Sequence, residues 1–269
     1  MLRLGIVDFD SSHSVEFARR FNRKTHDREQ FVDGAEVVVA WPGSSEMAPE
    51  RIPGFRSEIK SLEIPLVDSW QELIGQIDAV LILSLCGAAH LERVRPFLAA
   101  GIPAFVDKPF ACSVADAREM IELAESNNVT MFNASGLRFA EEVLDVERNR
   151  KTFGTVQGAI TYGPAKRADG NPGLFHYGIH SVEVLFELLG TGCESVMTSC
   201  TDGAEVVTGC WSDGRLGTVR GSRSGATLYG FLAYCENGVL QRDVSTRFAY
   251  RNLCRKIIES FETETPAVS

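Results

Sequence analysis

Side chains suited to acid–base chemistry stand at two places in the sequence. Lys108 and Pro109 directly follow an apolar run, and His176, His180 and Glu183 are spaced four and three residues apart. Histidine exchanges a proton near neutral pH because its unperturbed pKa is about 6.5. If the run before Lys108 is a strand of a parallel sheet, this lysine lies at the carboxyl edge, where open α/β sheets bind ligands. The alternative is that Lys108 is an ordinary solvated lysine.

The histidine-rich segment also allows a second interpretation, a metal site. If one helix contains His176, His180 and Glu183, all three side chains lie on one face, and two imidazoles with a carboxylate can bind zinc. However, Gly173 and Gly178 predict that the helix begins only near His180 and leaves His176 in the preceding loop. We therefore predict no metal site. A histidine hydrogen-bonded in the core is the third interpretation.

The segment after the first apolar run bears on dinucleotide binding. Residues 8–13 read Asp-Phe-Asp-Ser-Ser-His, where the dinucleotide fingerprint has G-x-G-x-x-G. In one interpretation Asp10, Ser11 or Ser12 simply caps the next helix. In the other, the hydroxyls of Ser11 and Ser12 replace glycine amides at an anion site on the helix N-terminus. His13 either points into the cleft or is a first-turn helix residue.

The elements that must position these residues differ between the two halves of the chain. In the first half, continuous apolar runs alternate with helix-like stretches, which predicts a doubly wound, Rossmann-like parallel sheet over residues 1–136. The predicted strands are 2–7, 35–41, 64–67, 77–83, 102–110 and 129–135. The predicted helices are 14–23, 69–76, 90–101 and 113–128, with Ser113 as an N-cap and Gly101 at a helix end.

The second half, residues 137–269, predicts an α+β domain with a mostly antiparallel sheet. Glycine-rich turns separate its strand-like segments, as in hairpins. These segments are 154–163, 194–201, 204–212, 214–222, 226–235 and 238–244. A charged helix is expected at 140–151, an amphipathic helix at 180–190 and a last helical piece at 251–261.

Composition excludes several classes of function. The net charge of −9 disfavours nucleic acids and anionic membrane surfaces. No apolar run approaches the roughly 18–20 residues that span a bilayer, and the N-terminus enters a strand without the features of a secretion signal. The seven cysteines contain no CxxC pair, which favours reduced thiols. We therefore expect a cytoplasmic protein.

Three segments together resemble one known family. The segment around Lys108 matches the family's His…AGKHV-x-x-EKP-x-A signature, with Asp107 in place of the usual Glu. The matching residues are His90, Ala100, Gly101, Val106, Lys108, Pro109 and Ala111. Arg138 and Phe139 are similar to an Arg-aromatic pair further along. In the family's G-x-x-x-D-x-G-x-H-x-x-D motif, Gly178 and His180 match, Glu183 replaces the last acid and His176 takes the usual Asp position. The sequence thus resembles the Gfo/Idh/MocA family, which includes glucose–fructose oxidoreductase and inositol dehydrogenase.

The resemblance implies an oxidoreductase that uses NAD or NADP to oxidise or reduce a sugar, cyclitol or related polyol. Lys108 would orient the reacting oxygen beside the nicotinamide, and His180 would move the hydroxyl proton. His176 would be an auxiliary catalytic residue: it gives no electrostatic support when neutral, and when protonated it lowers the pKa of His180. The implied cofactor-binding residues are Phe9, Asp10, Ser11, Ser12, His13, Leu85, Cys86, His90, Asp107 and Lys108. The implied substrate-binding residues are Arg138, Tyr162, His176 and His180.

The missing glycines keep another hypothesis open. In it, the protein is a relative that has lost cofactor binding and serves as a ligand-binding or assembly protein. The resemblance further implies a homodimer or homotetramer formed through the C-terminal sheet. By the same resemblance, the chain stops before a last long helix that packs back on the first domain, so we expect that helix to be absent.

Overall fold

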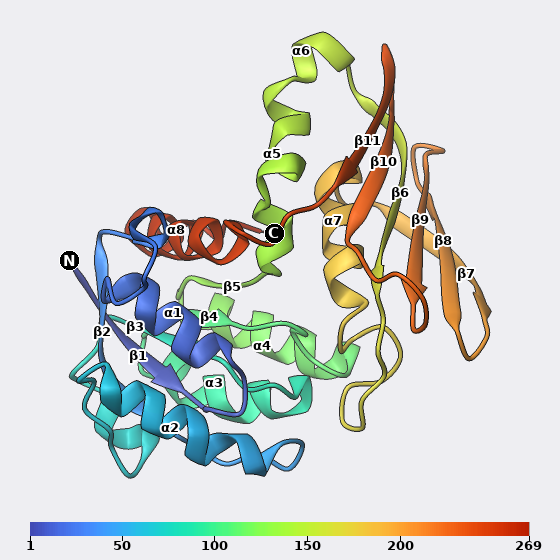
Figure 1. Ribbon diagram of the computed structural model, residues 1–269. Coiled ribbons are helices and arrows are strands. Elements are labelled where there is room, and N and C mark those ends of the chain that lie inside the picture. Colours follow the sequence, from blue (N-terminus) through green and yellow to red (C-terminus); the bar gives the residue numbers. More distant parts are fainter. Residues whose placement is uncertain (269) are drawn as a thin grey trace. The chain divides into compact units, whose positions relative to one another are not determined.

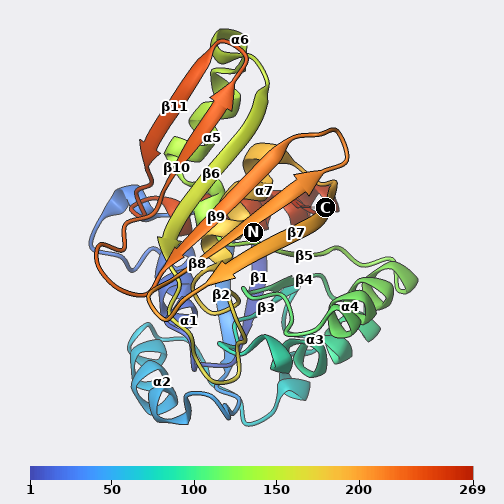
Figure 2. The same ribbon diagram turned by 90° about the vertical axis from the view of Figure 1, so that its right-hand side faces the viewer.

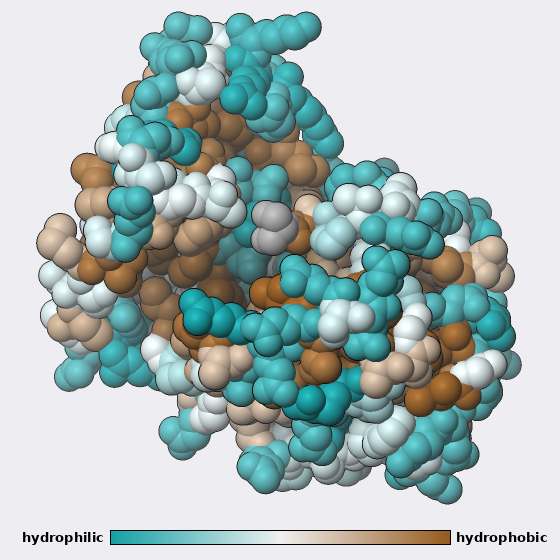
Figure 3. Space-filling view, turned by 180° about the vertical axis from the view of Figure 1, so that it is seen from behind, coloured by the Kyte–Doolittle hydropathy of each residue, from teal (hydrophilic) through white to brown (hydrophobic). Residues whose placement is uncertain are grey.

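The computed structural model describes residues 1–268, which divide into two compact units. Unit 1 contains Met1–Ala134, Asp169–Asn171 and the chain from Tyr250 onward. Unit 2 contains Ser135–Ala168 and Pro172–Ala249. Hydrophilic residues predominate over the face drawn in Figure 3, with apolar residues between them, as the composition leads one to expect.

Unit 1 is built on a parallel sheet with strand order β2-β1-β3-β4-β5 (Figure 1). Its strands are β1 (Leu2–Val7), β2 (Ala35–Trp41), β3 (Ala79–Ile82), β4 (Ala104–Val106) and β5 (Met131–Asn133). Its helices are α1 (His13–Phe21), α2 (Ile52–Ser61), α3 (His90–Ala99), α4 (Val114–Ser126) and α8 (Ala249–Thr263). Strands β2 and β3 both follow β1 in the chain and lie on opposite sides of it, which is the strand order of a doubly wound sheet.

Both faces of this sheet are covered, because its strands are apolar on both sides. Ala104 and Val106 of β4 belong to a core cluster with Phe97 of α3 and Met120 of α4. Phe105 points to the other face, where its ring lies 6.1 Å from that of Phe17 in α1. The continuous apolar runs in the sequence therefore do mark strands buried on both faces, and the predicted fold class is confirmed.

Unit 2 is a six-stranded sheet of order β11-β10-β6-β9-β8-β7 (Figure 2). Its strands are β6 (Val156–Pro164), β7 (Cys193–Cys200), β8 (Ala204–Trp211), β9 (Leu216–Ser222), β10 (Gly230–Cys235) and β11 (Gly238–Asp243). Neighbouring strands are antiparallel except β6 and β9, which run parallel. The sheet is thus mostly antiparallel, as predicted.

Helices α5 (Glu141–Arg148), α6 (Arg150–Phe153) and α7 (Ile179–Leu189) complete unit 2. Along α7, Val184, Leu185, Leu188 and Leu189 are buried in one core cluster with residues of the sheet, among them Phe231. This apolar face holds α7 on the sheet and so fixes its first turn, which carries His180.

Several local predictions differ from the structure, among them the strand predicted at 102–110, which is β4 and ends at Val106. Residues 64–67 form a single bridge, Ala40 with Leu66, instead of a strand. The predicted helix at 69–76 is only a 3₁₀ turn, Trp70–Leu73, which ends where Ile74 turns to an extended conformation. Helix α2 was not predicted, because its segment has a weak apolar stripe and only Ile59 is buried.

The expectation that a returning C-terminal helix is absent is wrong. Helix α8 begins at Ala249, and from Tyr250 onward the chain belongs to unit 1. The Tyr250 ring packs edge-on against Phe17 of α1, with 5.8 Å between centroids. In the part of the chain that the structure describes, no helix is both long and apolar enough to cross a bilayer.

Candidate functional site

The loop after β1 carries a buried carboxylate in a glycine-like backbone conformation. Asp8 has φ of +70°, in the left-handed region that favours glycine, and it stands where the dinucleotide fingerprint has its first glycine. Its Oδ2 accepts hydrogen bonds from Arg93 Nε at 3.0 Å and from the Ser84 hydroxyl. Burial raises the pKa of Asp8 to about 6, although Arg93 and Ser84 oppose that rise and the neighbouring Asp10 adds to it. The Asp8 charge is therefore paired inside the unit.

Arg93 connects this carboxylate to the loop after β2. Its guanidinium lies 5.2 Å from the ring centroid of Trp41, and its Nη2 donates to Ser44 Oγ at 3.1 Å. One arginine of α3 thus links the ends of β1 and β2. No sequence pattern indicates Arg93, because α3 has several charged residues and Arg93 lies 85 positions from Asp8 in the chain.

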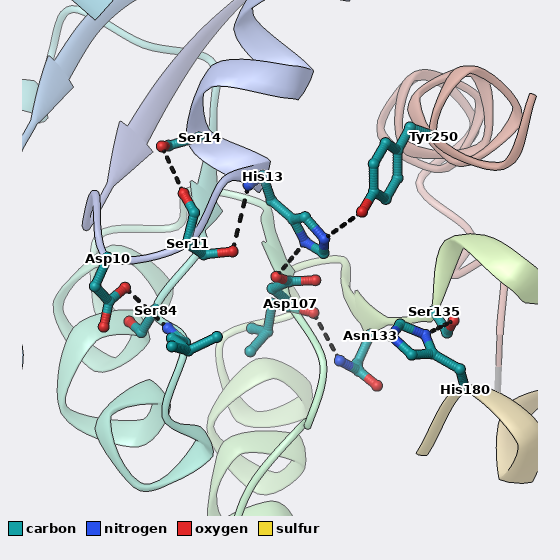
Figure 4. Close-up of polar contacts among 12 residues, drawn as sticks. Asp10, Ser11, His13, Ser14, Ser84, Asp107, Asn133, Ser135, His180 and Tyr250 are labelled. Atoms are coloured by element: carbon teal, nitrogen blue, oxygen red, sulfur yellow. Dashed lines mark hydrogen bonds and ion pairs between the residues drawn. The ribbon is translucent and has the colours of Figure 1, made fainter. Parts of the chain in front are cut away.

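The remainder of the loop is held by its own side chains (Figure 4). Asp10, only 2% exposed, accepts the backbone N–H of Leu85 at 2.9 Å, which ties the loop to the end of β3. Ser11 Oγ accepts the N–H of His13 at 3.3 Å, so Ser11 takes part in capping the first turn of α1. Ser12 occupies the N-cap position without a side-chain hydrogen bond. Phe9 is fully buried.

His13 is a first-turn residue of α1, and its ring lies inside unit 1. Nδ1 lies 2.5 Å from Oδ2 of Asp107, and Nε2 lies 2.9 Å from the hydroxyl of Tyr250 in α8 (Figure 4). Burial alone would raise the pKa of Asp107, but His13 and Lys108 outweigh it and hold that pKa below its ordinary value. Asp107, His13 and Tyr250 thus form a linked chain of side chains, which we call the His13 relay.

Lys108 follows Asp107 at the carboxyl edge of β4 and is 6% exposed. The solvated-lysine alternative does not hold. His90 is fully buried, with Nδ1 3.0 Å from the carbonyl oxygen of Phe110 and Nε2 3.0 Å from that of Ser84. Burial lowers the pKa of His90, against the effect of these two carbonyls. His90 therefore joins the segment after Lys108 to the end of β3.

Asn171, which no sequence motif indicates, closes the loop after β3. Its Nδ2 donates to the carbonyl of Leu85 at 2.8 Å, and its Oδ1 accepts the N–H of Gly87 at 3.0 Å. The residue between them, Cys86, has its thiol directed to the carbonyl of Gly170. Leu85 and Cys86 are thus at the carboxyl edge of the sheet, beside β1 and β4.

In unit 2, His180 stands in the first turn of α7, with Nδ1 2.6 Å from Ser135 Oγ (Figure 4). His176 precedes α7, as the glycines predicted, and its ring lies 4.8 Å from that of Tyr177. Ser135 was not predicted from the sequence, because a serine at a strand end has no distinctive pattern.

The remaining predicted substrate residues are engaged within unit 2. Arg138 donates to Glu183 and Glu187, both at 2.7 Å. Burial would lower the pKa of Arg138, but the two glutamates raise it overall. Tyr162 donates to Asp243 at 3.1 Å, and burial together with that carboxylate raises its pKa.

The metal interpretation finds no support in this geometry, because Glu183 is ion-paired with Arg138. Across residues 1–268, no group of three or more His, Cys, Asp or Glu side chains is placed to hold a metal ion.

Within unit 1, the structure gathers residues from three sequence segments at one edge of the sheet. This site, which we call the sheet-edge site, contains Asp10, Ser11, Ser12, His13, Leu85, Cys86, Asp107 and Lys108. An open parallel sheet with a helix N-terminus and titratable groups at its carboxyl edge defines the Rossmann class of α/β domain.

Comparison with known proteins relates part of the chain to one family of Rossmann-fold enzymes. Residues 6–135 match the model of the oxidoreductase family with an NAD-binding Rossmann fold, GFO_IDH_MocA. This segment, slightly less than half of the chain, is similar to that family and includes the Lys108 motif that the sequence analysis compared with it. An inositol 2-dehydrogenase of Cereibacter sphaeroides is 31% identical over 125 residues, which cover 46% of this chain and 33% of that protein. The match thus spans about a third of the length of the curated relatives.

Solved structures extend the likeness over the whole fold. A scyllo-inositol dehydrogenase from Lactobacillus casei, with NAD(H) and scyllo-inositol bound, has a TM-score of 0.78 at 14% identity and covers 99% of this chain and 91% of its own. A myo-inositol 2-dehydrogenase from Lactobacillus plantarum has a TM-score of 0.77 at 15% identity, with coverages of 100% and 91%. At these identities the likeness shows the fold.

Proposed function

We propose that this protein is an NAD(P)-dependent oxidoreductase that transfers hydride between a nicotinamide cofactor and a sugar, cyclitol or related polyol. The observation that carries the proposal is the family match over residues 6–135, which includes the loop after β1 and the Asp107–Lys108–Pro109 segment after β4. Relatives named as inositol dehydrogenases support the substrate class.

The residues of the sheet-edge site fit a dinucleotide although the fingerprint glycines are absent. Asp8, Asp10 and His13 stand at the three glycine positions and are 1%, 2% and 6% exposed. Each side chain is bonded to groups inside unit 1 and so does not fill the surface above the loop. The backbone of Asp8 adopts the left-handed conformation that a glycine would supply.

The electrostatics of the loop agree with this fit. The charge of Asp8 is offset by Arg93 at 3.0 Å, so like-charge repulsion with a pyrophosphate is reduced. The first turn of α1 contributes backbone N–H groups and the positive end of a helix dipole. Ser12, half-buried and free of a capping bond, supplies a hydroxyl beside that turn.

In the proposed reaction, the bound nicotinamide would accept or donate the hydride. Lys108 would orient the substrate oxygen, and its positive charge would stabilise negative charge that develops there. His180 would take up or return the hydroxyl proton. Ser135 would keep the His180 ring in one orientation through the contact at Nδ1, and His176 would modulate the acidity of His180 through its charge.

The test is reduction of NAD or NADP by a panel of cyclitols and sugars, followed by nicotinamide absorbance. His180→Asn is expected to lower kcat by about 10²–10⁴-fold, the usual contribution of a general acid–base group. The matched control is His26→Asn, since His26 is exposed and lies outside both groups of candidate residues. A kcat of His180→Asn equal to that of the wild type and of His26→Asn would contradict the assigned role of His180.

The competing function is that of a relative which has lost cofactor binding, and the three non-glycine positions of the loop are the observation in its favour. Direct cofactor binding separates the two functions, because the relative without cofactor would show none with either NADH or NADPH.

We further propose that the protein acts in the cytoplasm as a homodimer or homotetramer through the sheet of unit 2. In support, the edge strand β7 exposes Val196 and Met197, which are 63% and 71% accessible. Sedimentation equilibrium tests this assembly, and Met197→Glu is expected to shift it toward monomer. A wild-type protein that sediments as a monomer would contradict it.

A further inference from the structure

Three sulfur atoms of unit 1 converge on one short segment of backbone. Cys86 follows β3, Cys112 precedes α4, and Met47 lies between β2 and α2. The carbonyl oxygen of Gly170 accepts hydrogen bonds from Cys86 Sγ at 3.4 Å and Cys112 Sγ at 3.3 Å. Both thiols thus share one acceptor atom. Two loops of the parallel sheet therefore present their thiols side by side.

The third sulfur is held in the same cluster by Asn171. Its Nδ2 lies 3.6 Å from Met47 Sδ, and its Oδ1 accepts Cys112 Sγ at 3.4 Å. Asn171 is only 1% exposed and is fixed by its hydrogen bonds to the loop after β3. One amide thus positions a thioether and a thiol.

Space remains beside these sulfurs. Gly170 has φ of +93°, and a Cβ added to it would lie 3.4 Å from Cys86 Sγ and 3.5 Å from Met47 Sδ, which is ordinary van der Waals contact. The side of Gly170 between the two sulfurs can therefore take an atom of roughly methyl size without overlap.

Two thiols and a thioether are soft ligands. Thiolate and thioether sulfur favour Cu(I), whereas zinc in proteins is bound by thiolate, imidazole and carboxylate. We propose that Cys86, Cys112 and Met47 bind one soft monovalent cation, represented by Cu(I). Binding releases the two thiol protons to solvent, and two Cu–thiolate bonds form together with one thioether contact. The charge of the complex is then −1, from one cation and two thiolates.

Access to the cluster is compatible with this role, because Cys86 and Cys112 are both half-buried and neither is enclosed. Cys235 is a free thiol of the same exposure class in β10 of unit 2, which makes it the matched control. Cys86 also belongs to the sheet-edge site, but Cu(I) titration of the protein without cofactor measures the sulfur site by itself, so its outcome is separate from that of the proposed oxidoreductase activity.

The experiment titrates Cu(I) into the reduced full-length protein under anaerobic conditions, in competition with a chromophoric Cu(I) chelator. We expect wild type and Cys235→Ser to withhold one equivalent of Cu(I) from the chelator. Cys86→Ser and Cys112→Ser should each lose that equivalent, and Met47→Leu, which keeps the side-chain volume, should retain it more weakly. Circular dichroism checks that each variant is folded.

Several results would overturn the proposal. These are failure of the wild type to withhold Cu(I), equal loss in Cys235→Ser, or retention after both Cys86 and Cys112 are replaced. Zn²⁺ displacing Cu(I) at equal concentration would show that the site is not soft. If either serine variant is unfolded, an unchanged affinity in Met47→Leu rejects the three-sulfur site.

Discussion

Two buried aspartates follow strands that end at the same carboxyl edge of the sheet. Their environments shift their pKa values in opposite directions. Asp8 follows β1 and its pKa is raised to about 6, because burial outweighs the attraction of Arg93. Asp107 follows β4 and its pKa is lowered, because His13 and Lys108 together outweigh burial. Both side chains are 1% exposed, so exposure does not explain the difference. The number and position of the nearby charges do.

Asp8 and Asp107 therefore have different roles at the sheet edge. At β1, burial raises the pKa of the carboxyl and Arg93 pairs with its charge, which suits a loop proposed to lie under a negatively charged pyrophosphate. At β4, the carboxylate keeps its charge and holds the His13 relay next to Lys108. Three substitutions test this contrast.

The largest effect is expected from Asp107→Ala. The substitution leaves His13 buried without its carboxylate partner, and breaking one side of a buried pair costs about 3–5 kcal/mol. Urea denaturation at neutral pH measures the loss in the free energy of unfolding. The matched control is Asp78→Ala, because Asp78 pairs with Arg3 at the surface and should cost less than about 1 kcal/mol. Equal losses of stability in the two variants would show that the buried pair of Asp107 with His13 contributes no more than the surface pair of Asp78 with Arg3.

A smaller, pH-dependent effect is expected from Asp8→Asn. A rise in pKa from 3.8 to about 6 means that the folded state binds this proton more tightly than the unfolded state, by about 3 kcal/mol. The Asp8 contribution to stability is therefore greatest below pH 4 and falls as pH rises to about 6. Asp8→Asn lacks this titration, so its stability relative to wild type should improve by about 2 kcal/mol between pH 4 and pH 7.

Denaturation curves of both proteins across this range provide the measurement. The pH dependence from Asp107 has the opposite sign. Because its pKa is lowered in the folded state, Asp107 stabilises the fold at pH values above its ordinary pKa, and this stabilisation is lost as the pH falls through the folded-state pKa. A difference between wild type and Asp8→Asn that stays constant with pH would show that Asp8 is not perturbed as described.

The smallest effect is expected from Tyr250→Phe. The substitution removes the hydroxyl 2.9 Å from His13 Nε2 and keeps the ring that packs on Phe17. A net loss of about 1 kcal/mol is typical of one such hydrogen bond. Thermal unfolding measures it. A loss as large as that of Asp107→Ala would mean that the His13 relay depends on Tyr250 as much as on Asp107.

Much of the fold could be predicted because its information is local. The apolar runs at residues 2–7 and 35–41 have the observed bounds of β1 and β2, and Ser113 caps α4 through its hydroxyl. The beginning of α7 after Gly178 also follows from residue type. By contrast, the bridge at Leu66 depends on where β2 lies, and a four-residue apolar run cannot reveal that.

The partners within the site could not be predicted, because they come from distant positions. His13 and Tyr250 are 237 residues apart, and no feature of Tyr250 marks it among the tyrosines. The same holds for Asp8 and Arg93, which turn an expected repulsive charge into a paired one. The residue types at the sheet edge were visible in the sequence, but the direction of each side chain was set by the fold.

We propose that a loop without the fingerprint glycines still accepts a nicotinamide dinucleotide. The test is calorimetric titration of the wild-type protein with NADH and with NADPH. We expect saturable binding at one molecule per chain for at least one of the two. Flat titrations with both cofactors would contradict it and would favour the relative that has lost its cofactor.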